Sequence, residues 1–74
     1  MAKSGVSKLL TRFGDNLRSV RKAQGVSQEN LANTAGMHRT YVSSVERRER
    51  NDTLETVEKL ANALKVSMTE LIPE

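Results

Sequence analysis

Apolar residues recur at helical spacing along most of the chain. They stand three or four residues apart, which places them on one face of a helix in each of four segments. The positions are Leu10, Phe13, Leu17 and Val20; Leu31, Ala32 and Ala35; Val42 and Val45; and Leu54, Val57, Leu60, Ala61 and Leu64. A fifth, short helix is expected after Ser67, because residues 67–70 match a capping box. The pattern therefore predicts an all-α protein of five helices, forming one domain over residues 9–74.

Small and polar residues mark the expected helix ends. Gly25 ends the first helix, and Thr53 or Asp52 caps the fourth. His38 is expected to cap the third, and without a second His or any Cys it is not expected to bind a metal. Gly14 lies inside the first helix, where glycine costs about 1 kcal/mol relative to alanine. We therefore expect it to permit close packing against a neighbouring helix.

Residues 27–47 have the pattern of two short helices joined by a tight turn. Ser27 is a good N-cap, because its hydroxyl can accept a hydrogen bond from a free backbone N–H. Gly36 can adopt the positive φ that ends a helix and turns the chain. A helical pair inside a bundle would share part of this pattern. The outward chemistry of the second helix favours a DNA-binding helix-turn-helix over about residues 28–47.

The second helix of this motif carries the candidate base-reading residues. Arg39 and Thr40 lie in its first turn, where side chains reach the base edges. Arginine can donate two hydrogen bonds to guanine, and the hydroxyl groups of Ser43 and Ser44 suit bases at close range. We therefore predict that Arg39, Thr40, Ser43 and Ser44 read the bases.

Other polar residues are candidates for contacts to the DNA backbone. Gln28 begins the first helix of the motif, where free N–H groups suit a phosphate oxygen; the alternative is a simple helix-start residue. Tyr41 can donate its hydroxyl to phosphate or pack its ring at the domain edge. Arg47, Arg50 and Asn51 belong to a charged connector, and such runs are usually solvated loops. This connector leaves the groove end of the helix, which favours DNA contacts.

Across residues 13–72 the chain resembles the Cro/phage-repressor-like (XRE-type) helix-turn-helix family. Three blocks narrow the resemblance to the controller proteins of restriction–modification systems: His-Arg-Thr-Tyr-Val-Ser at 38–43, Val-Glu-Arg at 45–47, and Arg-Asn-Asp-Thr-Leu at 50–54. The resemblance implies a compact, lambda-repressor-like DNA-binding domain. The usual family glycine after Glu-Arg is absent, and Arg48 occupies its place.

The resemblance also implies structural roles. In similar proteins the residue matching Arg21 forms an ion pair with the residue matching Glu46; the alternative is an exposed arginine that touches phosphate. The family dimerises through its C-terminal end, here Met68, Leu71 and Ile72, although these residues could equally close the monomer core. Dimers of this kind bind paired half-sites about one helical turn apart.

Charge is distributed unevenly along the chain. Residues 1–26 contain six Lys or Arg and one Asp, whereas residues 51–74 contain two Lys and five Asp or Glu. The basic first half suits a polyanion such as DNA, and the acidic last third would face away from it. A merely solvated surface is the alternative.

Composition excludes several kinds of function. The chain has no cysteine and one histidine, so neither a disulfide framework nor a thiolate metal site is expected. No nucleophile–base set or phosphate loop is present, which argues against an enzyme. We expect no cofactor and no metal. Phe13 and Tyr41 are the two aromatic residues, too few for a base-stacking binder of single strands.

The ends and the apolar runs predict the location of the protein. The longest apolar runs are two or three residues, so no membrane segment or signal peptide is predicted. We expect a cytoplasmic, nucleoid-associated protein. Residues 1–8 are small, polar and basic, and are expected to form a flexible N-terminal arm.

These observations together predict a homodimeric, sequence-specific transcriptional regulator. Its expected partners are double-stranded DNA, a second copy of the chain and RNA polymerase, with no membrane. If it is a controller protein, the resemblance implies that it activates and then represses its own gene and the endonuclease gene. The alternatives are a phage or plasmid repressor, or an antitoxin-type protein-interaction module. Little sequence remains outside the five helices to bind a toxin, which counts against the last of these.

Overall fold

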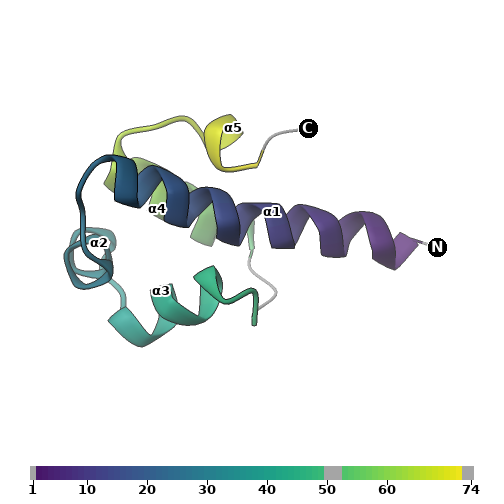
Figure 1. Cartoon of the computed structure of the whole chain (residues 1–74), viewed down its shortest axis with the longest axis horizontal. Helices are drawn as coiled ribbons and strands as arrows, with labels where there is room; N and C mark the ends of the chain where they lie inside the picture. The colour runs from purple at the N-terminus through teal and green to yellow at the C-terminus, as the bar shows by residue number, and fades with distance from the viewer. Residues whose placement is uncertain (1, 50–52, 73–74) are drawn as a thin grey trace.

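The described residues form five helices (Figure 1). The computed structural model describes residues 2–49 and 53–72, with the side chains of residues 12–49 and 53–72. The helices are α1 (Ala2–Ala23), α2 (Gln28–Ala35), α3 (Arg39–Glu46), α4 (Leu54–Leu64) and α5 (Met68–Leu71). No strand occurs within the described ranges. The predicted all-α class and the predicted number of helices are confirmed.

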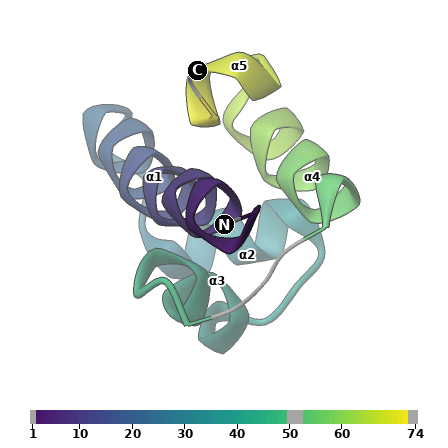
Figure 2. The same ribbon diagram turned by 90° about the vertical axis from the view of Figure 1, so that its right-hand side faces the viewer.

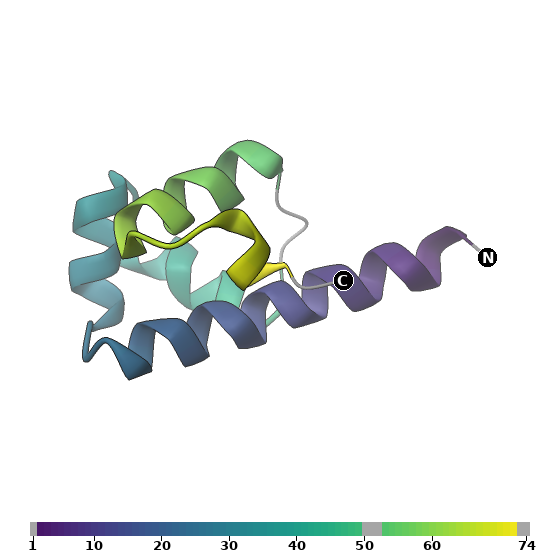
Figure 3. The same ribbon diagram turned by 90° about the horizontal axis from the view of Figure 1, so that it is seen from above.

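The first helix is longer than its apolar stripe predicted. It begins at Ala2, so residues 2–8 are helical where the sequence predicted a flexible arm. Ala2, Lys3 and Lys8 favour helix, and adding residues to an existing helix is easier than starting one. The N-terminal part of α1 projects beyond the other helices, as the view from above shows (Figure 3).

Two of the three caps that the sequence predicted, Ser27 and Gly36, hold the helix-turn-helix. The Ser27 hydroxyl accepts a hydrogen bond from the backbone N–H of Asn30 at 3.0 Å. Gly36 has φ 73°, and its N–H donates to the carbonyl groups at the end of α2. His38 occupies the N-cap position of α3, but its side chain makes no capping hydrogen bond. The turn between α2 and α3 therefore depends on Gly36.

The caps of the last two helices also follow from their sequence. Thr53 caps α4, because its hydroxyl accepts from the N–H of Thr56 at 3.3 Å. The capping box of α5 is present, with the N–H of Ser67 donating to the Glu70 carboxylate at 3.4 Å. The sequence left the N-cap of α4 open between Thr53 and Asp52, and the structure shows that it is Thr53.

One hydrophobic core joins all five helices. Its residues are less than a tenth exposed, and each large side chain contributes about 1.5–3 kcal/mol on burial. They are Phe13, Leu17, Leu31, Ala32, Val42, Val45, Val57, Leu60, Ala61, Leu64 and Leu71. Helix α3 and helix α5 lie on opposite sides of α1, as two perpendicular views agree (Figures 1 and 2). The core thus holds α3 at one edge of the molecule.

Gly14 lies where α1 and α3 cross. A Cβ atom at this position would stand 2.6 Å from the carbonyl oxygen of Val45 and 3.2 Å from Cγ of Arg48. Real Cβ atoms essentially never come this close to another heavy atom, so a side chain here would force the two helices to shift. The close packing that we predicted at Gly14 is therefore present.

Leu71 is not available to a second copy of the chain. It is 0% exposed within one molecule, because α5 folds back onto α1 and the Asn16 side chain donates to the Leu71 carbonyl at 3.1 Å. Its expected place in a dimer interface is wrong, and it closes the monomer core instead. Met68 and Ile72 are partly buried against the same core and remain candidates.

Within the described ranges, no helix is both long enough and apolar enough to cross a membrane.

Candidate nucleic-acid interface

Helix α3 lies at one edge of the molecule (Figure 2), and three of the four predicted base readers are at least partly exposed on it. Arg39 and Thr40 are exposed in its first turn, and Ser43 is partly exposed one turn later. The backbone of this turn is closed by hydrogen bonds from Tyr41 and Val42 to the His38 carbonyl, at 3.0 and 3.3 Å. Arg39 and Thr40 therefore project from a rigid helical turn.

Ser44 is the fourth predicted base reader, and it is buried. It is 7% exposed, and its hydroxyl donates to the carbonyl of Tyr41 at 2.8 Å. Helix α3 packs against both α1 and α2, so more of its surface is covered than the spacing of Val42 and Val45 indicated. The expectation that Ser44 points outward to read a base is wrong.

The sequence left two roles open for Tyr41, and the structure shows one of them. Its ring is partly buried and packs against the core. Its hydroxyl lies 3.4 Å from Oγ1 of Thr56 in α4, where either oxygen could be the donor. The ring packing is therefore present, and the contact to phosphate stays a prediction.

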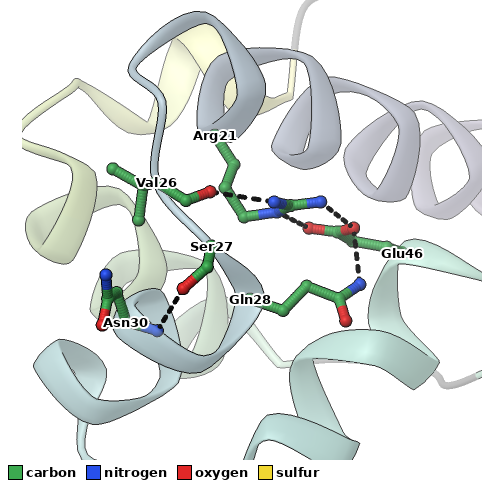
Figure 4. A network of polar contacts seen from close by, with 6 residues as sticks. All are labelled: Arg21, Val26, Ser27, Gln28, Asn30 and Glu46. Atoms are coloured by element: carbon green, nitrogen blue, oxygen red, sulfur yellow. Dashed lines mark hydrogen bonds and ion pairs between the residues drawn. The ribbon is translucent and has the colours of Figure 1, made fainter.

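The structure brings the predicted ion pair together (Figure 4). Arg21 donates from Nε to Oε2 of Glu46 at 2.7 Å and from Nη2 to Oε1 at 3.0 Å. A third donor, Nη1, reaches the carbonyl oxygen of Val26 at 2.9 Å. Both charged residues are 8% exposed. This bidentate ion pair connects the end of α1 to the end of α3. The Arg21 side chain therefore faces Glu46 and not solvent.

Gln28 completes the same network. Its side-chain nitrogen donates to Oε1 of Glu46 at 3.0 Å, so the start of α2 joins the other two helices (Figure 4). Sequence reasoning missed this role, because a residue 18 positions before Glu46 gives no local signal of the contact. The predicted phosphate contact of Gln28 would have to be made by a side chain already bonded to Glu46.

Arg47 directly follows α3, and its guanidinium donates hydrogen bonds to two neighbouring side chains. Its Nη1 donates to the hydroxyl of Ser43 at 2.6 Å, and its Nη2 donates to the Glu49 carboxylate at 3.1 Å. The hydrogen bond to Glu49, and then the charge of that carboxylate, raise the pKa of Arg47 above its usual value. Two predicted DNA-contacting residues, Ser43 and Arg47, are therefore linked to each other and to a carboxylate.

Arg48 adopts a backbone conformation that favours glycine. Its φ is 63°, which crowds the Cβ atom of any other residue. It occupies the place of the usual family glycine, so the chain keeps the left-handed turn without that glycine. The side chain lies across α1, with Nη1 3.8 Å from the Asp15 carboxylate, and both side chains are more than half exposed. Arg50 and Asn51 lie outside the described residues.

Comparison with known proteins identifies the family. The family model described as helix-turn-helix matches residues 17–71. The chain belongs to the helix-turn-helix family. The control protein C.SmaI of Serratia marcescens is 52% identical over 60 residues, covering 81% of this chain and 71% of that protein. The control protein C.BamHI of Bacillus amyloliquefaciens is 41% identical over 61 residues, covering 81% and 75%.

Solved structures agree with the sequence relatives. The restriction-modification controller protein C.AhdI of Aeromonas hydrophila has a TM-score of 0.81 and 48% identity, covering 85% of this chain and 96% of that one. The controller protein C.Esp1396I, solved as a tetramer with its natural 35 base-pair operator, has a TM-score of 0.80 and 33% identity, covering 85% and 83%. The predicted family and the predicted likeness to controller proteins are confirmed.

Proposed function

We propose that this chain is a sequence-specific regulator of transcription that binds double-stranded DNA as a homodimer on paired half-sites. The observation that carries the proposal is the presentation of α3. Its first turn exposes Arg39 and Thr40, while its buried end is fixed to α1 and α2 through Glu46. A rigid helix with exposed donors in its first turn suits insertion into the major groove.

The contacts divide into positioning and reading. Gln28, Tyr41 and Arg47 lie around α3 and are proposed to hold phosphates, which sets the register without reading sequence. Arg39 and Thr40 are proposed to read base edges, and Ser43 joins them once Arg47 releases its hydroxyl. Contacts from Arg50 and Asn51 to the backbone are predicted from the sequence alone.

The relatives favour a restriction–modification controller protein. Several bear the name of control proteins, and one such protein was solved as a tetramer on its operator. A controller of this kind would activate and then repress its own gene and the endonuclease gene, with RNA polymerase as a partner. A phage repressor is the second candidate, because the immunity repressor of Bacillus phage phi105 is 31% identical over 61 residues.

Selection of bound duplexes from a random DNA library tests the proposal. The full chain is used at two concentrations, and the enriched duplexes are sequenced. We expect an inverted repeat whose half-sites lie about one helical turn apart. A library that stays random at both concentrations would contradict sequence-specific binding and favour a protein-interaction module.

A further inference from the structure

A carboxylate lies beside the proposed DNA-contacting side chains. Glu49 accepts a hydrogen bond from Nη2 of Arg47 at 3.1 Å, while Nη1 of the same guanidinium donates to Ser43 at 2.6 Å. The side chains of Arg47 and Glu49 are each 55% exposed, so solvent and DNA can both reach the pair. Two residues of the proposed interface, Ser43 and Arg47, are thus bonded to each other and to a carboxylate before any DNA arrives.

The backbone holds Glu49 close to α3. Its N–H donates to the carbonyl of Ser44 at 3.0 Å, and the preceding residue, Arg48, turns the chain back with its positive φ. The carboxylate therefore cannot move far away when DNA binds. A phosphate that approaches Arg47 must displace Glu49 from the guanidinium, and the negative charge of Glu49 stays nearby and repels it.

We propose that Glu49 is an intramolecular counter-charge that weakens binding to non-operator DNA more than binding to the operator, and so increases specificity. The inference rests on the proposed function. It assigns to Glu49 a positioning role that acts through Arg47, because a carboxylate itself would not contact a phosphate.

The discrimination follows from an exchange of partners. On a matching duplex, Arg47 exchanges Glu49 for a phosphate, and Ser43 exchanges Arg47 for a base edge. On a non-matching duplex, Ser43 has no base partner in place, so Arg47 keeps its bonds to Ser43 and Glu49 and does not reach a phosphate. The charge of Glu49 then opposes the nearby phosphates. The pairing of Arg47 within the protein therefore lowers the affinity for a non-matching duplex more than the affinity for the operator.

The solvent exposure of the Arg47–Glu49 pair sets the size of its expected effect on DNA binding. A solvent-exposed ion pair changes an equilibrium by about two- to fivefold. Freeing one arginine for one phosphate should also steepen the dependence of log K on log salt by about 0.9. Both quantities lie within the reach of a titration by fluorescence anisotropy.

The test compares Glu49→Gln with a matched control. Glutamine keeps the size of the side chain and an acceptor oxygen for Arg47, but removes the charge. Glu58→Gln removes the same charge from an exposed position on α4 that takes no part in the hydrogen bonds among Ser43, Arg47 and Glu49. Each full-length protein is titrated with the selected operator and with a scrambled duplex of equal length, over a series of salt concentrations.

We expect Glu49→Gln to bind the scrambled duplex about two- to fivefold more tightly than Glu58→Gln does, with a salt slope steeper by about 0.9. Operator binding should rise by less than about twofold, so that the specificity ratio falls. In an Arg47→Gln background, the two acidic variants should become equivalent, because the guanidinium through which Glu49 is proposed to act is gone.

Each other outcome overturns the inference. Equal titrations of Glu49→Gln and Glu58→Gln would show that Glu49 is an ordinary surface charge, while the proposed function stands. A difference that persists without Arg47 would place the effect of Glu49 elsewhere. If the unaltered chain prefers no selected duplex over its scrambled form, the proposed function itself fails, and the role of Glu49 fails with it.

Discussion

Arg21 and Glu46 join three helices at the scale of single residues. Each is almost fully buried, and together they make two direct hydrogen bonds, with Val26 and Gln28 satisfying further groups. Removing two charges from water is costly, so the pair is weak evidence for stability by itself. Its effect is conformational, because losing either member leaves the other charge buried and unpaired.

Glu46→Ala should therefore destabilise the fold strongly. Arg21 would keep its charge without its carboxylate partner, and we expect the free energy of unfolding to fall by about 3–5 kcal/mol in urea denaturation. The double variant Arg21→Met with Glu46→Leu removes both charges and should recover most of the loss. A loss below about 1 kcal/mol in the single variant would mean that the pair behaves like an exposed one.

Arg39→Ala should change recognition and leave the fold intact. The side chain is exposed and belongs to no part of the core. We expect relaxed preference at one position of each half-site, with a cost of about 1–3 kcal/mol in binding the best sequence. Repeating the duplex selection with the variant measures this. Recovery of the same preference at every position would remove Arg39 from the base readers.

The crossing of α1 and α3 decides how the elements fit together. Gly14 lets the α1 backbone approach the carbonyl of Val45, and Arg48 then lies over the same crossing. The Arg21–Glu46 pair fixes the two helices further along α1. Two contacts along one pair of helices define both their distance and their orientation, so that α3 keeps a single position.

Gly14→Ala should destabilise the protein, against the usual trend. In an ordinary helix interior alanine is favoured by about 1 kcal/mol. Here the new Cβ would meet a backbone atom, and overpacking of this kind costs about 1–3 kcal/mol. Ser19→Ala, at an exposed position of α1, is the control and should not destabilise. Thermal unfolding of both variants measures these effects. A Tm for Gly14→Ala above that of the unaltered chain would contradict a tight crossing.

At the scale of the whole molecule, the two sides are proposed to have different roles. Helix α3 lies on one side of α1 and α5 on the other (Figure 2). Exposed basic residues of α1, including Arg18 and Lys22, contrast with exposed acidic residues such as Glu58 and Glu70 on α4 and α5. The C-terminal side is thus the less favourable one for DNA. Self-association through that side would leave both copies of α3 free for paired half-sites.

Ile72→Gln should weaken the homodimer while the monomer stays folded. Ile72 is partly exposed beside Met68, and loss of an apolar residue that anchors an interface costs more than about 1 kcal/mol of binding, whereas most interface residues cost less. We expect the dimer Kd to rise by about tenfold, measured by sedimentation equilibrium. Leu71→Ala is the contrast, because its burial predicts a loss of about 2–5 kcal/mol in stability. A wild-type sedimentation profile for Ile72→Gln would place the interface elsewhere.

Local signals were sufficient for much of this protein. Apolar spacing, Ser27, Gly36 and the Ser67 capping box determined the helices, because each acts within a few residues of its own position. The exposed positions of Arg39 and Thr40 followed from the same period. The resemblance to controller proteins supplied the Arg21–Glu46 pair, whose members are 25 residues apart.

Tertiary structure alone decided how much of each helix surface is covered. Ser44 is buried because α3 packs against two helices, and Leu71 is buried because α5 folds back onto α1. The bond from Gln28 to Glu46 likewise joins elements that are separate in sequence. A stripe of apolar residues specifies that one side of a helix is buried. The width of that side depends on how many neighbours pack against it, and those neighbours come from distant parts of the chain.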